Sequence, residues 1–149
     1  MKSERPEIIA INNDDYIAKY VGHTSDRRQF FVTTPFVGAH ADKPGAEFLA
    51  LYIFDPLGKL AEARIEHLGP RATLDKEKVS KLRQKWLDDL GPIRFYRIEV
   101  APFSVVRFGI EFGLVLWEPE DDDAKWQVTM EPGNYMAFFE PWDSGEYDT

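Results

Sequence analysis

The sequence predicts an α+β fold, in which mostly antiparallel hairpins form a sheet and one amphipathic helix packs on a face of it. Three observations lead to this prediction. Residues 47–68 have the pattern of a long hairpin with a central strand, and residues 75–90 have the only convincing helical pattern. The other apolar segments are short, rich in aromatic and β-branched residues, and separated by turn formers. We expect one domain over residues 1–149, since a chain of this length buries about 68–70% of the surface that its unfolded form exposes.

The hairpin 47–68 is the expected centre of the sheet. Its first half, 47–54, is apolar at nearly every position, which is typical of a strand covered on both faces. Residues 55–58 (Asp-Pro-Leu-Gly) then supply a proline that presets φ and a glycine that accepts a positive φ. The return half alternates apolar and charged side chains, as expected of a strand with one exposed face.

The region before this hairpin predicts a first, shorter hairpin. Its strands are 16–21 and 29–34, which are rich in aromatic and β-branched residues, and the loop 22–28 joins them. Residues 7–11 could add a short strand. The segment 35–46 contains two prolines and two glycines, so we expect an irregular loop of the kind that often carries function.

Residues 75–90 predict an amphipathic helix. Asp75 is a candidate N-cap, and Gly91 followed by Pro92 ends the helix. Lysines and arginines over 76–85 are interpreted as a solvated face. We expect the apolar residues to form one stripe that packs on the sheet: Val79, Leu82, Trp86, Leu87 and Leu90.

The second half of the chain returns to strands. Within the strand predicted over 93–101, an irregularity at residues 96–97 is typical of a bulge. For 103–117 we predict two strands, and a single kinked strand is the alternative. The predicted elements are, in order, a strand over 93–101, two strands over 103–117 that meet near 107–109, an acidic loop over 118–123, and a hairpin of 126–130 with 135–139.

The charge of the chain is unevenly distributed around a net charge of −8. Residues 71–107 carry nine basic and five acidic side chains, whereas residues 108–149 carry one basic and eleven acidic ones. An acidic third of the chain disfavours nucleic acid, because phosphate contacts supply most non-specific affinity. We therefore predict no nucleic-acid binding and expect a protein partner with a basic surface.

Cysteine usage and hydropathy restrict the class of protein further. The chain has no cysteine, which excludes disulfides, thiol nucleophiles and cysteine-based metal sites. Its first residues are too charged for a signal peptide, and no apolar run approaches the roughly 20 residues of a membrane span. We predict a soluble, cytoplasmic protein with no membrane association.

Residues that could support chemistry are sparse. His40 and Asp42, with Glu47 or His67, could supply imidazole and carboxylate ligands, but a metal site needs three or four ligands to converge. The serines lie in no nucleophile elbow, and the sequence contains no glycine-rich phosphate loop. We predict no catalytic residue, metal or cofactor, and retain His40, Asp42 and Glu47 as candidate binding residues at the 35–46 loop.

The C-terminal segment contains further candidate binding residues. Trp142 and Tyr147 lie among polar residues, whereas disordered tails are poor in aromatics. We expect Trp142 to dock on the domain, with Asp143 forming an Asx-type turn. In the alternative, Trp142 and Tyr147 are exposed anchors for a partner.

Four stretches of the chain resemble a known group of proteins: 29–36, 51–58, 112–115 and 141–149. They are similar to a bacterial family of uncharacterised proteins of about 150 residues. Some of its members carry the label formate hydrogenlyase regulatory protein. The resemblance implies a regulatory role, but it carries over no catalytic or binding residue.

Together these features favour a non-enzymatic cytoplasmic protein that binds another macromolecule, in regulation or as an immunity-type inhibitor. The alternative is a small-molecule-binding or hydrolytic domain that uses the 35–46 loop.

Overall fold

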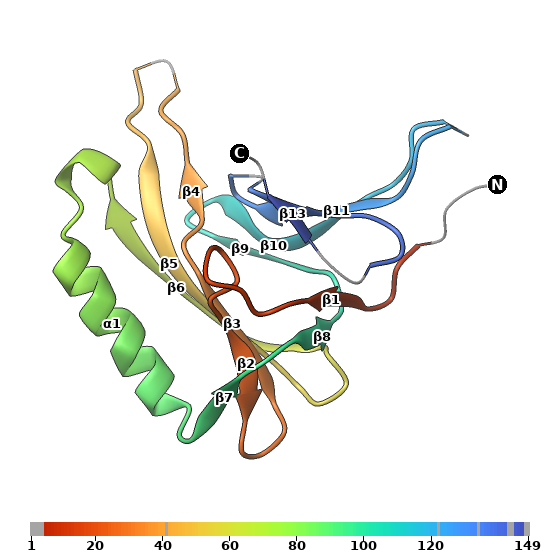
Figure 1. Ribbon diagram of the computed structural model, residues 1–149. Helices are drawn as coiled ribbons and strands as arrows, with labels where there is room; N and C mark the ends of the chain where they lie inside the picture. Colours follow the sequence, from red (N-terminus) through yellow and green to blue (C-terminus); the bar gives the residue numbers. More distant parts are fainter. Residues whose placement is uncertain (1–4, 41, 122, 134, 143–144, 148–149) are drawn as a thin grey trace.

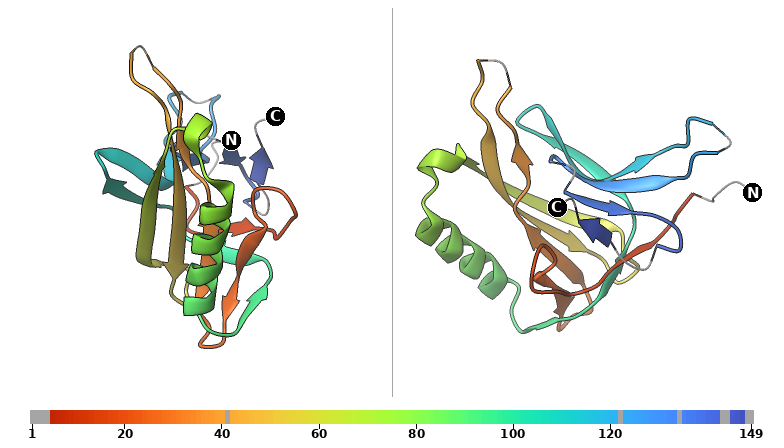
Figure 2. Two further views of the ribbon diagram at one scale, coloured as in Figure 1. Left: turned by 90° about the vertical axis from the view of Figure 1, so that its left-hand side faces the viewer. Right: turned by 45° about the horizontal axis from the view of Figure 1, so that its top comes forward.

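The fold consists of three layers: a helix, a larger sheet, which we call the first sheet, and a second sheet (Figure 1). The computed structural model describes residues 5–40, 42–121, 123–133, 135–142 and 145–147. The helix lies across one face of the first sheet, and the second sheet covers the other face (Figure 2). All strand pairs between the named strands are antiparallel, which confirms the predicted α+β class.

The first sheet is organised around β5 (Ala46–Phe54). On one side β5 pairs with β6 (Leu60–Gly69), and on the other with β3 (Gln29–Thr33) and the two-residue β4 (Phe36–Val37). Beyond β3 lie β2 (Tyr20–Thr24) and the edge strand β7 (Ile93–Phe95). The predicted central hairpin is confirmed, and its turn contains Gly58 at φ 92°.

Both faces of β5 are covered, which explains its unbroken apolar sequence. Alternate residues of a strand point to opposite faces of the sheet. The odd-numbered residues Leu49, Leu51 and Ile53 therefore pack in the layer beneath the helix, while the even-numbered ones pack between the two sheets. The latter are Ala50, Tyr52 and Phe54.

Helix α1 (Lys76–Asp89) follows a short 3-10 turn, η1 (Arg71–Thr73), and begins as predicted. The Asp75 carboxylate accepts hydrogen bonds from the backbone N–H groups of Glu77 and Lys78, at 3.1 and 3.2 Å. The predicted stripe packs on the first sheet against Phe30, Val32, Leu49, Leu51 and Ile53. In the part of the chain that the structure describes, no helix is long and apolar enough to cross a membrane.

The second sheet has the order β13-β12-β11-β10-β9. Strands β9 and β10 meet in a tight turn at residues 108–109, so the segment 103–117 forms two strands and not one kinked strand. The predicted last hairpin is confirmed by the pairing of β11 with β12. The strand at the end of the chain was not predicted. The bounds are Phe103–Arg107, Ile110–Trp117, Gln127–Glu131, Met136–Phe138 and Gly145–Tyr147 for β9 to β13.

Two predicted strands had wrong boundaries. Strand β2 begins at Tyr20, and residues 16–19 form a turn, because the Asp14 carboxylate accepts hydrogen bonds from the backbone N–H groups of Tyr16 and Ala18. Strand β2 also extends to Thr24, into the predicted loop 22–28, because its pairing with β3 and β7 continues there. The segment 93–101 is not one strand with a bulge. It divides into β7, which pairs with β2, and β8 (Ile98–Val100), which pairs with β1 (Ile9–Ile11) in a separate two-stranded ribbon.

Candidate functional site

A cleft of about 450 Å³ opens beside α1, at the side of the first sheet where β3 and β4 meet. A second hollow of about 410 Å³ adjoins it beneath the first turns of α1. Four residues line both: Thr34, Glu47, Arg71 and Arg83. We call the two hollows together the arginine cleft. Tyr16, Tyr20 and Tyr135 are among the other residues of the larger hollow.

An ion pair between Glu47 and Arg71 lies in the wall of the arginine cleft. The Arg71 Nε atom donates to Glu47 Oε1 at 2.6 Å. The Glu47 side chain is only 12% exposed, whereas that of Arg71 is 77% exposed. Glu47 is buried because β5 runs between β4 and β6 at this point, and a buried carboxylate needs such a partner. Among the described residues, the two terminal nitrogens of Arg71 have no hydrogen-bond partner.

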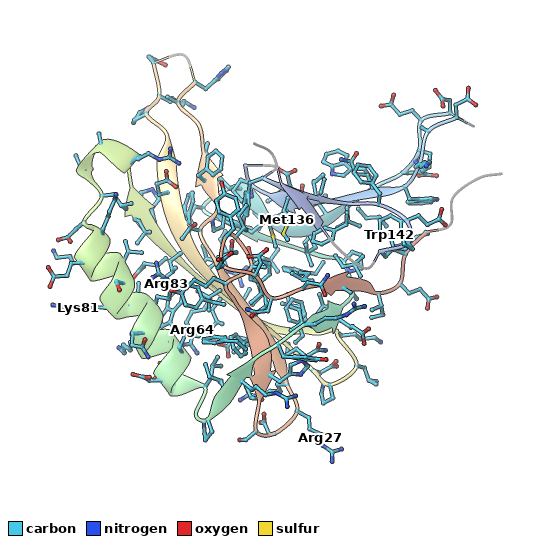
Figure 3. The ribbon with its side chains drawn as sticks, in the orientation of Figure 1. Arg27, Arg64, Lys81, Arg83, Met136 and Trp142 are labelled. Atoms are coloured by element: carbon cyan, nitrogen blue, oxygen red, sulfur yellow. The ribbon has the colours of Figure 1, made fainter. Side chains whose placement is uncertain are left out.

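Arg83 is a half-buried cation on the inner side of α1. In Figure 3 its side chain lies between α1 and the first sheet, whereas Lys81 points to the opposite side of the helix. The guanidinium lies 5.0 Å from the centroid of the Tyr20 ring. No carboxylate of the described residues forms an ion pair with it. Arg83 therefore brings positive charge into the cleft without a counter-ion from this part of the chain.

The floor of the cleft is polar and buried. The hydroxyls of Thr33 and Tyr135 are 2.9 Å apart, and both residues are buried. Burial raises the pKa of Tyr135 above its usual value, and the nearby charge of Glu131 adds to this shift.

Tyr52 lies in the core between the two sheets, and within the described residues its buried hydroxyl has no hydrogen-bond partner.

The structure separates the three candidate residues of the 35–46 region. His40 and Asp42 are exposed in the connection between β4 and β5, where the backbones of His40 and Lys43 exchange hydrogen bonds of 3.1 and 2.9 Å. Glu47 lies at the base of this connection, in the arginine cleft. The described residues contain no group of three or more His, Asp or Glu side chains that could hold a metal ion.

The C-terminal segment docks on the domain through Trp142, as predicted. The side chain is half-buried and packs on the core between the two sheets. The backbone N–H of Ala10 donates to the carbonyl of Trp142 at 2.7 Å. Asp143 and the side chain of Tyr147 fall outside the described residues, so the Asx-type turn and the role of Tyr147 as an anchor stay predictions.

Sequence reasoning missed Arg71 and Arg83, although one signal for Arg83 was present. Arg83 follows Val79 by four positions and precedes Trp86 by three, so it belongs to the inner side of the helix. Interpreting every basic residue over 76–85 as solvated overlooked this spacing. Arg71 carries no comparable local signal, because its partner Glu47 is 24 residues earlier in the chain.

A scan against protein-family models found no match, and searches of the curated proteins and of the solved structures found none either.

Proposed function

We propose that this protein is a non-enzymatic binding domain, and that the arginine cleft holds part of a partner or ligand. The observation that carries the proposal is Arg83, a half-buried guanidinium that no described carboxylate neutralises, in a chain with 26 acidic side chains. Burial of a charge is costly unless it is paired. A ligand that entered the cleft would supply the missing counter-charge.

Two further features support binding rather than catalysis in this cleft. The Oε1 atom of Glu47 accepts from Arg71, so this carboxylate has a structural partner within the chain. Tyr16, a residue that is 65% exposed, adds an aromatic ring to the lining of the cleft. Aromatic and arginine side chains are the residues most enriched in the energetic centres of protein interfaces.

The experiment isolates the tagged wild type and two tagged variants from source cells. Mass spectrometry then identifies the proteins and small molecules that are bound to each. Tyr16→Ala removes an aromatic ring from the lining of the cleft. Tyr96→Ala is the matched control, since Tyr96 is 57% exposed and does not line the cleft. We expect the bound component to be lost from Tyr16→Ala and retained by Tyr96→Ala. Retention by both variants would place the binding site elsewhere.

The alternative is a small-molecule-binding or hydrolytic domain that uses the 35–46 loop, and its hydrolytic form is distinguished by the fate of the bound component. A binding domain returns it unchanged after incubation, whereas a hydrolase converts it. Conversion that is lost in the double variant His40→Ala, Asp42→Ala would favour the hydrolase.

A partner with a basic surface fits a different region, the second sheet and the loop that follows β10. The exposed acidic residues of this region include Glu111, Glu118, Glu120, Asp121 and Asp123. A basic partner that bound there would associate more slowly as salt screens the attraction. Association rates that do not change between low and high salt would contradict this proposal.

A further inference from the structure

We infer that the arginine cleft binds the phosphoryl group of a phosphate monoester. The inference rests on the proposed function, because it names the ligand chemistry of the same cleft.

The charges that line the cleft match a dianion. Arg71, Arg83 and Lys76 contribute three positive charges, and Glu47 contributes one negative charge that already pairs with Arg71. The surplus is therefore two positive charges. A phosphate monoester carries a charge of about −1.5 to −2 at neutral pH, whereas a single carboxylate would neutralise only half of the surplus.

The donor groups of the cleft also suit a phosphoryl group, which offers three acceptor oxygens. Both terminal nitrogens of Arg71 are without a hydrogen-bond partner among the described residues, and Arg83 contacts Tyr20 through its guanidinium. The exposed residues Thr34 and Ser80 add hydroxyl groups to the lining. Planar guanidinium groups bind phosphate oxygens in a bidentate manner, which gives geometric specificity as well as charge.

The anion would not be held by the N-terminus of α1. The Asp75 carboxylate already accepts from the N–H groups of Glu77 and Lys78, so this end of the helix is capped by the chain itself. Recognition would therefore come from the side chains of Arg71, Arg83 and Lys76. The rest of the ligand would extend toward exposed Tyr16, which also lines the larger hollow.

The test measures the affinity of the purified protein for three probes by calorimetry: inorganic phosphate, phenyl phosphate and benzoate. We expect phenyl phosphate to bind more tightly than benzoate. Arg83→Gln should weaken phenyl phosphate at least about tenfold, because it removes a charge-assisted contact. Lys81→Gln is the matched control, since it makes the same change of charge on the solvent side of α1, where Lys81 pairs with Glu77.

Glu47→Gln provides a test with the opposite sign. Glutamine keeps an oxygen acceptor for the Arg71 Nε atom and removes the negative charge of the cleft. Phenyl phosphate should therefore bind more tightly to Glu47→Gln than to the wild type. This variant also keeps the inference falsifiable if Arg83→Gln fails to fold.

Two results would overturn the inference: tighter binding of benzoate than of phenyl phosphate, or an equal loss of affinity in Arg83→Gln and Lys81→Gln. Failure of the proposed function is a separate result, because it appears in the recovery experiment with Tyr16→Ala. If Tyr16→Ala loses the recovered component but the wild type has no affinity for phenyl phosphate, the cleft remains the binding site and the phosphoryl group is rejected as its ligand.

The natural source of the phosphoryl group is distinguished by two further probes. A peptide with one phosphotyrosine and the same peptide without phosphate represent a phosphorylated protein, whereas phenyl phosphate represents a small metabolite. Affinity for the phosphopeptide well above that for phenyl phosphate would identify a modified protein as the source, and equal affinities would identify a small molecule.

Discussion

The two flanks of α1 are built from similar residues but differ in how their arginines are paired. On the β6 flank, Arg64 lies 5.8 Å from the Trp86 ring centroid and forms ion pairs with Glu62 at 2.9 Å and Asp89 at 3.4 Å. On the β2 flank, Arg83 lies over the ring of Tyr20, and the described residues supply no carboxylate to it. Both arginines lie between α1 and the first sheet (Figure 3).

This difference shows that a candidate binding site is indicated by whether a charged side chain has a partner, and not by the presence of the charge alone. The charge of Arg64 is satisfied within the chain, and its guanidinium lies over the Trp86 ring. Arg83 leaves the opposite flank open, at the arginine cleft. A count of charges along the helix would treat the two flanks alike.

The largest expected effect on stability comes from the apolar layer between α1 and the first sheet, which the two flanks share. Trp86→Ala removes a buried side chain between α1 and the first sheet, and such truncations cost about 3–5 kcal/mol of unfolding free energy. We expect a large fall in the urea midpoint, measured by far-UV circular dichroism. An unchanged midpoint would show that α1 does not depend on this layer, and the comparison of its flanks would lose its basis.

Alkaline pH should weaken the core between the two sheets, which contains Tyr135 and Tyr52. Burial raises the pKa values of Tyr135 and Tyr52 above the usual 10.0, so the folded state keeps protons that the unfolded state releases. Their contribution to stability is present below pH 10 and is lost as the pH rises from there toward the folded pKa values. Each tyrosine can cost up to about 1.4 kcal/mol per pH unit in that range. We expect the urea midpoint to fall steeply above pH 10, and Tyr135→Phe to reduce this fall, with Tyr16→Phe as the exposed control.

A smaller effect should distinguish the flanks directly. Arg64→Gln removes two partly exposed ion pairs and the charge over Trp86, and we expect a loss of about 0.5–1 kcal/mol in urea unfolding. Salt should reduce this difference, because it screens the exposed pairs. A loss that does not respond to salt would assign the stabilisation to packing alone.

The smallest expected effect is that of Arg83→Gln on stability. Removing an arginine that has no carboxylate partner should change the unfolding free energy by less than about 0.5 kcal/mol. A loss larger than that of Arg64→Gln would reverse the comparison and make Arg83 a structural residue. Urea unfolding of the two variants side by side decides between these outcomes.

The sequence predicts the parts of the fold in which pattern and local chemistry agree. The apolar run 47–54, the turn at Gly58 and the capped stripe of α1 each combine two signals, and each forms as predicted. The boundary of β2 was wrong because the Asp14 carboxylate forms a turn at residues whose composition favours a strand. The division of 93–101 depends on which distant strands, β1 and β2, are available to pair.

The candidate site was less predictable, because long-range contacts create it. Glu47 was selected as a companion of His40 and Asp42, yet its partner is Arg71. That pairing depends on β5 and η1 meeting after the whole β5–β6 hairpin has folded back. Local spacing could identify Arg83 on the inner side of α1, but not the absence of a carboxylate opposite it among the described residues.

The ribbon of β1 and β8 has a consequence for the order of folding. Ile9 pairs with Val100, and Ala10 donates to the carbonyl of Trp142, so the first described strand is held by residues far along the chain. The hairpin of β5 and β6 closes a short loop, whereas β1 must wait for both distant partners. Contacts between residues far apart in sequence slow folding, because the entropy of a long loop is lost before they form. We therefore expect β1 to join late, and a chain emerging from the ribosome to keep this strand incompletely paired until residues 98–100 and Trp142 have been synthesised.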